Sequence, residues 1–265
     1  LTKGVMVAGQ PVVFRLTGSG SSLNYDAWSP SPIAQAALED RLRFFLSLDD
    51  DLEPFYTVGR SDASFAPILD ALYGLHQVKF LTPFENVIWA VLTQRTPMPM
   101  ARKMKAALVA AKGATLTIDG VDYPVFPQAD QLAGLSEVEL QAIIGHKPKA
   151  AYLANVIAAF ARTDERWMRA APTLEVEAWL RGIKGIGPWS AMFVLIRGLG
   201  RMDAALDAGE ELMQAVGAAY GEGRPATARE VAAHAKPYGA LQGYWSYYLR
   251  AFGAVTGQAP AMRSA

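Results

Sequence analysis

The stretch Ile183–Ala191 has the residue types and the spacing to bind an anion. It holds two glycines, Gly185 and Gly187, followed by Pro188 and a tryptophan. Glycine allows positive φ angles and lets another backbone approach closely. Proline suits the first turn of a helix, where its missing N–H costs nothing. Unpaired N–H groups at such a helix start favour an anion, and a DNA phosphate is one such anion.

Two apolar segments must position this stretch. Pro172 and Thr173 start a predicted helix over 174–182, and a second apolar helix follows from Pro188 to residue 198. The pattern therefore predicts a helix, a tight hairpin and a helix. An ordinary connection between two buried helices fits the same spacing, since short glycine turns between helices are common.

The composition limits the class of protein. The chain has 265 residues, of which 51% are hydrophobic and 19% charged, so it is globular rather than disordered. Zero cysteines exclude disulfides, thiolate zinc sites and cysteine-ligated iron–sulfur clusters. His76, His146 and His234 lack metal-ligand spacing, and no apolar run is long enough for a membrane span. We therefore expect no metal site and no membrane partner.

The charge balance gives no support to nucleic-acid binding. The 25 basic and 25 acidic residues cancel to a net charge of zero, whereas a basic domain would point to nucleic acid. Local basic groups remain at Arg95, Arg102, Lys103 and Lys105, and at Lys147 and Lys149. Each group fits either a locally positive surface or an ordinary solvated helix face.

The predicted fold class is mainly α (α+β), with a small β element before the helices. Residues 1–28 are rich in β-forming residues, with Gly9-Gln10 as a turn and the glycine–serine run 18–22 closing the region. A hairpin is not stable alone, so this one must pack on another element; if the start of the chain is truncated, part of its sheet is absent. We assign residues 1–30 to a remnant of an N-terminal β domain and 31–265 to a helical domain in two lobes, with the hairpin at 180–200.

Helical spacing of apolar residues and helix-start signals locate the helices. Thr82-Pro83-Phe84-Glu85 is a capping sequence and Ser136-Glu-Val-Glu139 a capping box. The carboxylates of Asp49–Asp51 suit a helix cap better than a metal site. Residues 113–126 are polar, and we expect them to be irregular. The other expected helices cover residues 31–48, 52–56, 63–75, 82–94, 100–111, 128–133, 136–144, 147–162, 209–219, 226–235 and 240–253.

The hairpin motif resembles that of a known family. Leu180-x-x-Ile183-Lys-Gly-Ile-Gly-Pro-Trp-Ser-Ala191, followed by Arg197-Gly-Leu-Gly-x-x-Asp203, is similar to the helix-hairpin-helix DNA glycosylase superfamily. Within it, the 3-methyladenine DNA glycosylase II branch is the most similar. The resemblance covers most of the chain and is strongest over 82–214. It implies a glycosylase helical domain behind a small N-terminal β element.

The resemblance implies roles for the hairpin and for a loop near residue 94. Ile183, Lys184, Gly185, Ile186 and Gly187 would bind the DNA backbone through main-chain N–H groups. The family's hairpin carbonyls can hold a monovalent cation, and no other cofactor is implied. Gln94 and Arg95 match the loop that fills the gap left by a flipped base, although the family often has an apolar residue where Arg95 stands.

The resemblance also implies a base pocket. Trp189 and Phe193 match aromatic positions of this pocket, with core packing as the alternative, because they lie four residues apart on one helix face. The aromatic-rich last helix would contribute another ring, for which we select Trp245. Trp189 stands where the bifunctional branch has its lysine nucleophile, so the resemblance implies a monofunctional hydrolase without lyase activity.

The catalytic carboxylate is missing from its expected position. Counted without gaps from Arg197 and Asp203, the family's catalytic aspartate falls on Gly209, which we expect to be the N-cap of the next helix. Glu210 or Asp207 would supply the carboxylate after a local shift. Alternatively, the fold binds DNA without excising bases, or another group acts. Glu210 and Glu211 also fit first-turn acids that complement a helix dipole.

Two functions follow from the resemblance. The first is a base excision repair glycosylase that hydrolyses the N-glycosidic bond of alkylated purines of the 3-methyladenine type after base flipping. The second is a catalytically impaired protein that binds DNA and recognises damage on the same fold. A helical protein whose hairpin binds no DNA is the third hypothesis. For the first two we expect double-stranded DNA as partner, a monomer, and a cytoplasmic location, associated with the nucleoid in a bacterium.

Overall fold

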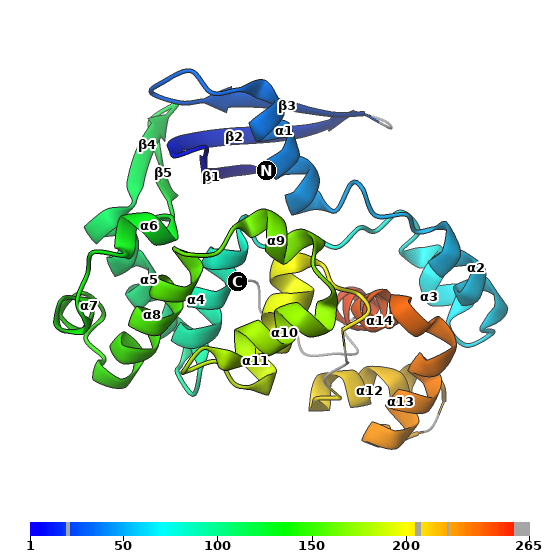
Figure 1. The fold of residues 1–265 in the computed structure, drawn as a ribbon. Helices are drawn as coiled ribbons and strands as arrows, with labels where there is room; N and C mark the ends of the chain where they lie inside the picture. Colours follow the sequence, from blue (N-terminus) through cyan, green and yellow to red (C-terminus); the bar gives the residue numbers. More distant parts are fainter. Residues whose placement is uncertain (20–21, 205–207, 222, 257–265) are drawn as a thin grey trace. The chain divides into compact units, whose positions relative to one another are not determined.

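The structure is a computed structural model that describes residues 1–19, 22–204, 208–221 and 223–256 (Figure 1). The chain divides into two compact units. The first unit comprises Leu1–Phe45 and Phe80–Val194, and the second comprises Leu46–Lys79 and Leu195–Ala265. Each unit therefore combines two separate stretches of the sequence.

A three-stranded antiparallel sheet begins the first unit. β1 (Thr2–Val7), β2 (Gln10–Ser19) and β3 (Ser22–Trp28) pair in the order β1-β2-β3, and Figure 1 shows them side by side. The turn between β1 and β2 contains Gly9, as predicted. Val12, Val13 and Phe14 of β2 are completely buried. The predicted β-rich start is confirmed, and β3 extends it.

The expectation that residues 113–126 are irregular is wrong. Residues Ala114–Ile118 (β4) and Val121–Val125 (β5) form an antiparallel hairpin. Its turn is Asp119-Gly120, with φ angles of 52° and 75°. An Asp-Gly pair favours such a two-residue turn, because both positions need positive φ. That pair was the signal in the sequence that we did not use.

Helices make up the rest of the first unit. α4 lies at its centre, with Val87, Ile88 and Leu92 fully buried, and it contacts α5, α8 and α11. The predicted caps are confirmed: Thr82 Oγ1 accepts the N–H of Glu85 at 3.0 Å, and Ser136 and Glu139 form a capping box. The helices of this unit are α1 (Gln35–Leu46), α4 (Pro83–Thr93), α5 (Met98–Lys112), α6 (Ala129–Leu132), α7 (Glu137–Ile144), α8 (Lys147–Phe160), α9 (Glu165–Ala170), α10 (Thr173–Gly182) and α11 (Pro188–Phe193).

The second unit is helical around an aromatic core. Phe55 lies at its centre, with its ring 4.9 Å from that of Tyr248 and 5.7 Å from that of Tyr244. Asp51 Oδ1 accepts the N–H of Glu53, the first residue of α2, at 3.0 Å, although the N-cap itself is Leu52. The helices are α2 (Glu53–Ser61), α3 (Ala66–Ala71), α12 (Glu210–Ala219), α13 (Ala228–Ala235), the 3₁₀ helix η2 (Lys236–Leu241) and α14 (Gln242–Thr256). A π-helix, η1 (Val194–Gly198), follows α11 directly.

The observed fold is mainly helical with a small N-terminal sheet, as predicted. Within the described part of the chain, no helix has an apolar stretch long enough to cross a membrane.

Candidate functional site

The hairpin between α10 and α11 has the predicted geometry. Gly185 adopts a φ of 106°, which the left-handed turn requires and which favours glycine. Ile183 and Ile186 are buried and anchor the turn, whereas Lys184 and Gly187 are exposed. Gly187 is the N-cap of α11, with Pro188 at the first helical position. The exposed side of the hairpin is therefore main chain plus one lysine, as anion binding needs.

Helix α8 packs against the hairpin through Tyr152. A Cβ atom on Gly185 would lie 2.6 Å from Cγ of Tyr152. The hairpin backbone therefore lies closer to the tyrosine ring than a residue with a side chain at position 185 would allow. Glycine at this position therefore serves both the turn and the packing.

The carbonyl oxygens of the hairpin could serve as ligands for a monovalent cation of the kind that the family's hairpin can hold. Ile183 O accepts the N–H of Ile186 at 3.0 Å, and Gly185 O accepts the side-chain amide of Gln94 at 2.9 Å. Because a carbonyl oxygen has two lone pairs, each retains one, and oxygen ligands suit such an ion. The residues present therefore fit the group.

The loop after α4 is held against the hairpin. Gln94 is the C-cap of α4, and its Nε2 donates to Gly185 O at 2.9 Å and to Ser190 Oγ at 3.1 Å. Arg95 follows with a φ of 49° and an exposed side chain. The structure thus brings Gln94 to the hairpin, a contact that the sequence did not predict, and commits its amide to protein atoms. Arg95 is the residue of the pair with an exposed side chain.

Sequence reasoning missed the role of Lys149. We grouped it with Lys147 as a basic pair, but only Lys147 is exposed, whereas Lys149 is 4% exposed. Its ammonium donates to Val91 O at 2.7 Å and to Gln94 O at 2.8 Å. Burial lowers the pKa of this ammonium below its ordinary value. One signal was present: Lys149 lies where the apolar face of α8 requires a buried residue.

Two aromatic side chains stack at the start of the helix after the hairpin. The rings of Trp189 and Phe193 are 5.2 Å apart and 12° from parallel. Trp189 is 46% exposed, and the ring of Phe80 lies edge-on to Phe193 at 5.9 Å. Core packing therefore accounts for Phe193 in part, but not for Trp189. An exposed, supported aromatic face is a platform on which a base can stack.

The assignment of Trp245 to a base pocket is wrong. Its side chain is completely buried. Its Nε1 donates to Tyr220 Oη at 3.0 Å, and its ring lies 5.8 Å from that of Tyr238. All three residues belong to the core of the second unit, so Trp245 has no exposed face for a ligand.

Gly209 is the N-cap of α12, as predicted, with φ −64° and ψ 164°. Glu210 follows at the first helical position with an exposed side chain, whose Oε1 accepts a bond from Gln214 Nε2 at 3.2 Å. Asp207 lies outside the described residues. Glu210 thus lies where a first-turn acid complements the helix dipole, and it is accessible to solvent.

Residues Met202 and Ala204 are held by α14. The N–H of Gly243 donates to Met202 O at 2.8 Å, and the Gln242 amide reaches Ala204 O at 3.3 Å. Arg197, in the π-helix η1, lies 6.0 Å from the ring of Tyr247. π-helical turns often occur at functional sites, and this one connects the stacked aromatic pair to the segment leading to Gly209.

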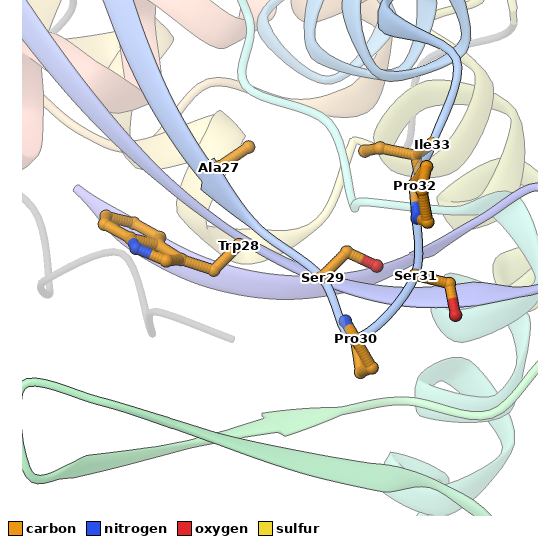
Figure 2. Close-up of a pocket in the computed structure, with 7 residues that line it drawn as sticks. All are labelled: Ala27, Trp28, Ser29, Pro30, Ser31, Pro32 and Ile33. Carbon is orange, nitrogen blue, oxygen red and sulfur yellow. The ribbon is translucent and has the colours of Figure 1, made fainter.

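A surface hollow elsewhere in the first unit does not belong to this site. Figure 2 shows that it is lined by consecutive residues of one stretch, Ala27–Ile33. None of the lining side chains is titratable, and none was predicted as a site residue. The hollow therefore adds no chemistry to the candidate site.

Comparisons with known proteins find DNA glycosylases that are similar to this chain in sequence and in fold. No protein-family model matches the chain. The chain is 29% identical over 227 residues to a Bacillus subtilis (strain 168) protein named DNA-3-methyladenine glycosylase, covering 82% of this chain and 74% of that protein.

Two solved structures share the fold. A 3-methyladenine DNA-glycosylase from Archaeoglobus fulgidus matches with a TM-score of 0.76 and 19% identity, over 96% of this chain and 87% of that one. The 8-oxoguanine glycosylase/lyase of Clostridium acetobutylicum, in complex with dsDNA, matches with a TM-score of 0.70 and 16% identity, over 96% and 88%. By its sequence the chain is a homologue of a 3-methyladenine DNA glycosylase, and it shares its fold with solved DNA glycosylases.

Proposed function

We propose that the protein is a monofunctional DNA glycosylase that removes alkylated purines of the 3-methyladenine type from double-stranded DNA. The observation that carries this proposal is the exposed face of Trp189, stacked on Phe193 directly after the hairpin. An alkylated purine is electron-poor, and its ring stacks well on an aromatic face. The name of the Bacillus subtilis relative supports the same substrate.

The proposed reaction is a hydrolysis. The damaged base first leaves the duplex, which costs a few kcal/mol and is easiest for a damaged base. The bond between the sugar C1′ and the purine nitrogen then breaks, and its electron pair leaves with the base. Water adds its oxygen to C1′ and loses a proton. Because an alkylated purine is already a good leaving group, the protein needs no strong general acid.

A carboxylate would stabilise the positive charge that develops on the sugar. We assign this role to Glu210, which is exposed at the first position of α12 beside Gly209. Asp207 is the second candidate. Trp189 replaces the amine that a lyase requires, so the strand is not cleaved. Arg95, exposed on its strained loop, would occupy the gap left by the base.

A second function is favoured by one observation: the N-cap of α12 carries no side chain. A protein with this N-cap would bind and recognise damaged DNA with little or no excision. Both functions place the protein with duplex DNA, in the cytoplasm and at the nucleoid of a bacterium. For both we propose that it acts as a monomer, with the hairpin bound to one strand.

The release of 3-methyladenine and 7-methylguanine from alkylated duplex DNA tests the first function. Glu210→Gln removes the charge with little change in shape, and we expect release to fall about a hundredfold. Glu211→Gln, at the next position, is the matched control and should leave release unchanged. Asp207→Asn is measured in parallel. Undiminished release in both Glu210→Gln and Asp207→Asn would reject the shifted carboxylate.

Strand cleavage is measured in the same reactions. We expect no strand cleavage unless alkali is added, and no covalent complex between protein and DNA after borohydride treatment. Binding to an abasic-site duplex without any base release would support the second function. No binding to either duplex at moderate salt would reject both functions.

A further inference from the structure

Helix α8 contacts both the hairpin and the loop after α4 through neighbouring side chains. Lys149 and Tyr152 are three residues apart, and such pairs lie on the same face of a helix. Tyr152 contacts the hairpin backbone at Gly185, and Lys149 contacts the end of α4 and the loop that follows. One helix face therefore touches both the hairpin and the loop that carries Arg95.

The loop is fixed by hydrogen bonds to one carbonyl. Gln94 O accepts the ammonium of Lys149 at 2.8 Å and the hydroxyl of Thr96 at 2.9 Å. This carbonyl belongs to the peptide that joins Gln94 to Arg95. Arg95 has a φ of 49°, which is unfavourable for a residue with a side chain. Fixing the carbonyl fixes the peptide plane, and with it the direction in which Arg95 leaves the backbone.

The ammonium of Lys149 has an uncommon environment for a buried charge. It donates to two carbonyl oxygens, and one of them, Val91 O, lies in the last turn of α4, where the helix dipole favours a cation. Burying a charge is costly unless it is well hydrogen-bonded. An apolar residue would fill the same space at lower cost but would remove one of the two hydrogen bonds that hold the loop carbonyl.

We propose that Lys149 is a positioning residue, which holds the Gln94–Arg95 loop in its strained conformation and, through the Gln94 amide, locks this loop to the hairpin. The proposal deepens the proposed function, because it rests on Arg95 and the hairpin acting together on one flipped site. The hairpin alone would bind any duplex, whereas the locked loop would favour a duplex with a gap in its base stack.

The first test uses the free protein and is independent of DNA. Lys149→Met keeps an unbranched chain of similar length and removes the charge, and Gln94→Leu cuts the bridge at its other end. Hydrogen exchange over segments 93–98 and 183–187 should become at least about fivefold faster in both variants. Lys147→Met, on the same helix and exposed, is the control and should leave both segments unchanged. Unchanged exchange at 183–187 in both test variants would overturn the proposal.

The second test measures affinity for an intact duplex and for the same duplex with an abasic-site analogue. We expect Lys149→Met to lower the preference for the abasic duplex about tenfold. Lys147→Met should weaken both duplexes equally and keep their ratio. A global loss of stability in Lys149→Met would weaken both duplexes as well, so the ratio separates positioning from folding.

A double variant that combines Lys149→Met with Gln94→Leu shows whether the two residues act through one network. If Lys149 acts through Gln94, the double variant should lose no more preference than the worse single variant; additive losses would overturn the proposal. If exchange at 183–187 responds but the unaltered protein shows no abasic preference and releases no base, the positioning role stands and the proposed function fails.

Discussion

The ring of Trp189 stacks on that of Phe193 with 5.2 Å between ring centroids and 12° between planes. We expect Trp189→Ala to lower the rate of base release about tenfold to a hundredfold, because stacking on an aromatic ring contributes about 1–3 kcal/mol per base. The stability of the protein should change little, since the side chain is 46% exposed. Single-turnover release from an alkylated duplex and thermal unfolding measure the two effects.

Trp167→Ala is the matched control for this variant. Trp167 is 36% exposed and contacts Trp179 edge-on in the same unit, so it is a second partly exposed tryptophan that packs on another ring. Base release should be unchanged. If both variants lose release equally, the stacked pair has no specific role.

Gly185→Ala should damage the hairpin. The new Cβ would lie 2.6 Å from the Tyr152 ring, and the backbone would keep a φ of 106° that costs an L-residue about 1–3 kcal/mol. We expect weaker binding to any duplex, intact or damaged, measured by fluorescence anisotropy. Gly182→Ala is the control, because no atom lies within 4 Å of its added Cβ. Equal affinities for Gly185→Ala and the unaltered protein would contradict main-chain binding by the hairpin.

Gly209→Asp should restore a carboxylate at the N-cap of α12. The φ and ψ of Gly209, −64° and 164°, suit an aspartate cap, which stabilises a helix start by about a few tenths of a kcal/mol relative to glycine. If charge at this position limits the chemistry, base release should rise about tenfold or more. Gly209→Asn caps equally well without the charge and should give no rise. An equal rise with asparagine would assign the effect to capping.

Acid should weaken the start of α13. Oε1 of Glu230 accepts Arg224 Nη2 at 2.6 Å, Oε2 accepts Thr227 N at 2.7 Å, and these bonds lower the pKa of Glu230 to about 2. Its folded pKa is below its unfolded value, so the stabilisation is present above the unfolded pKa and is lost as the pH falls toward 2. Glu230→Gln should therefore lose less stability between pH 5 and pH 2, as followed by urea unfolding. A parallel decline in both proteins would contradict this linkage.

Local signals predicted the elements well. The threonine and proline before α4, the capping box of α7 and the glycine pattern of the hairpin each depend on residues within a few positions of one another. Such signals act through local backbone geometry. The β4–β5 hairpin was missed although its Asp-Gly turn is equally local, because its polar residues suggested a loop.

Contacts between distant residues were not predictable in the same way. Gln94 and Gly185 are 91 positions apart, and Lys149 reaches back 58 positions to Val91. The helical spacing of Lys149 indicated a buried position, but nothing near it in the sequence identified the carbonyl oxygens that accept from its ammonium. For Trp245, the resemblance implied that the last helix contributes a ring to the base pocket, and only the packing of the second unit shows that this ring is core.

The glycine at the N-cap of α12 also bears on how this protein could change over generations. A glycine codon that ends in a pyrimidine becomes an aspartate codon by one transition at its second base. Because the backbone at Gly209 already suits either residue, both versions of the gene would encode a protein that folds. A lineage could therefore move between the two N-caps by one mutation, in either direction, without passing through a misfolded intermediate.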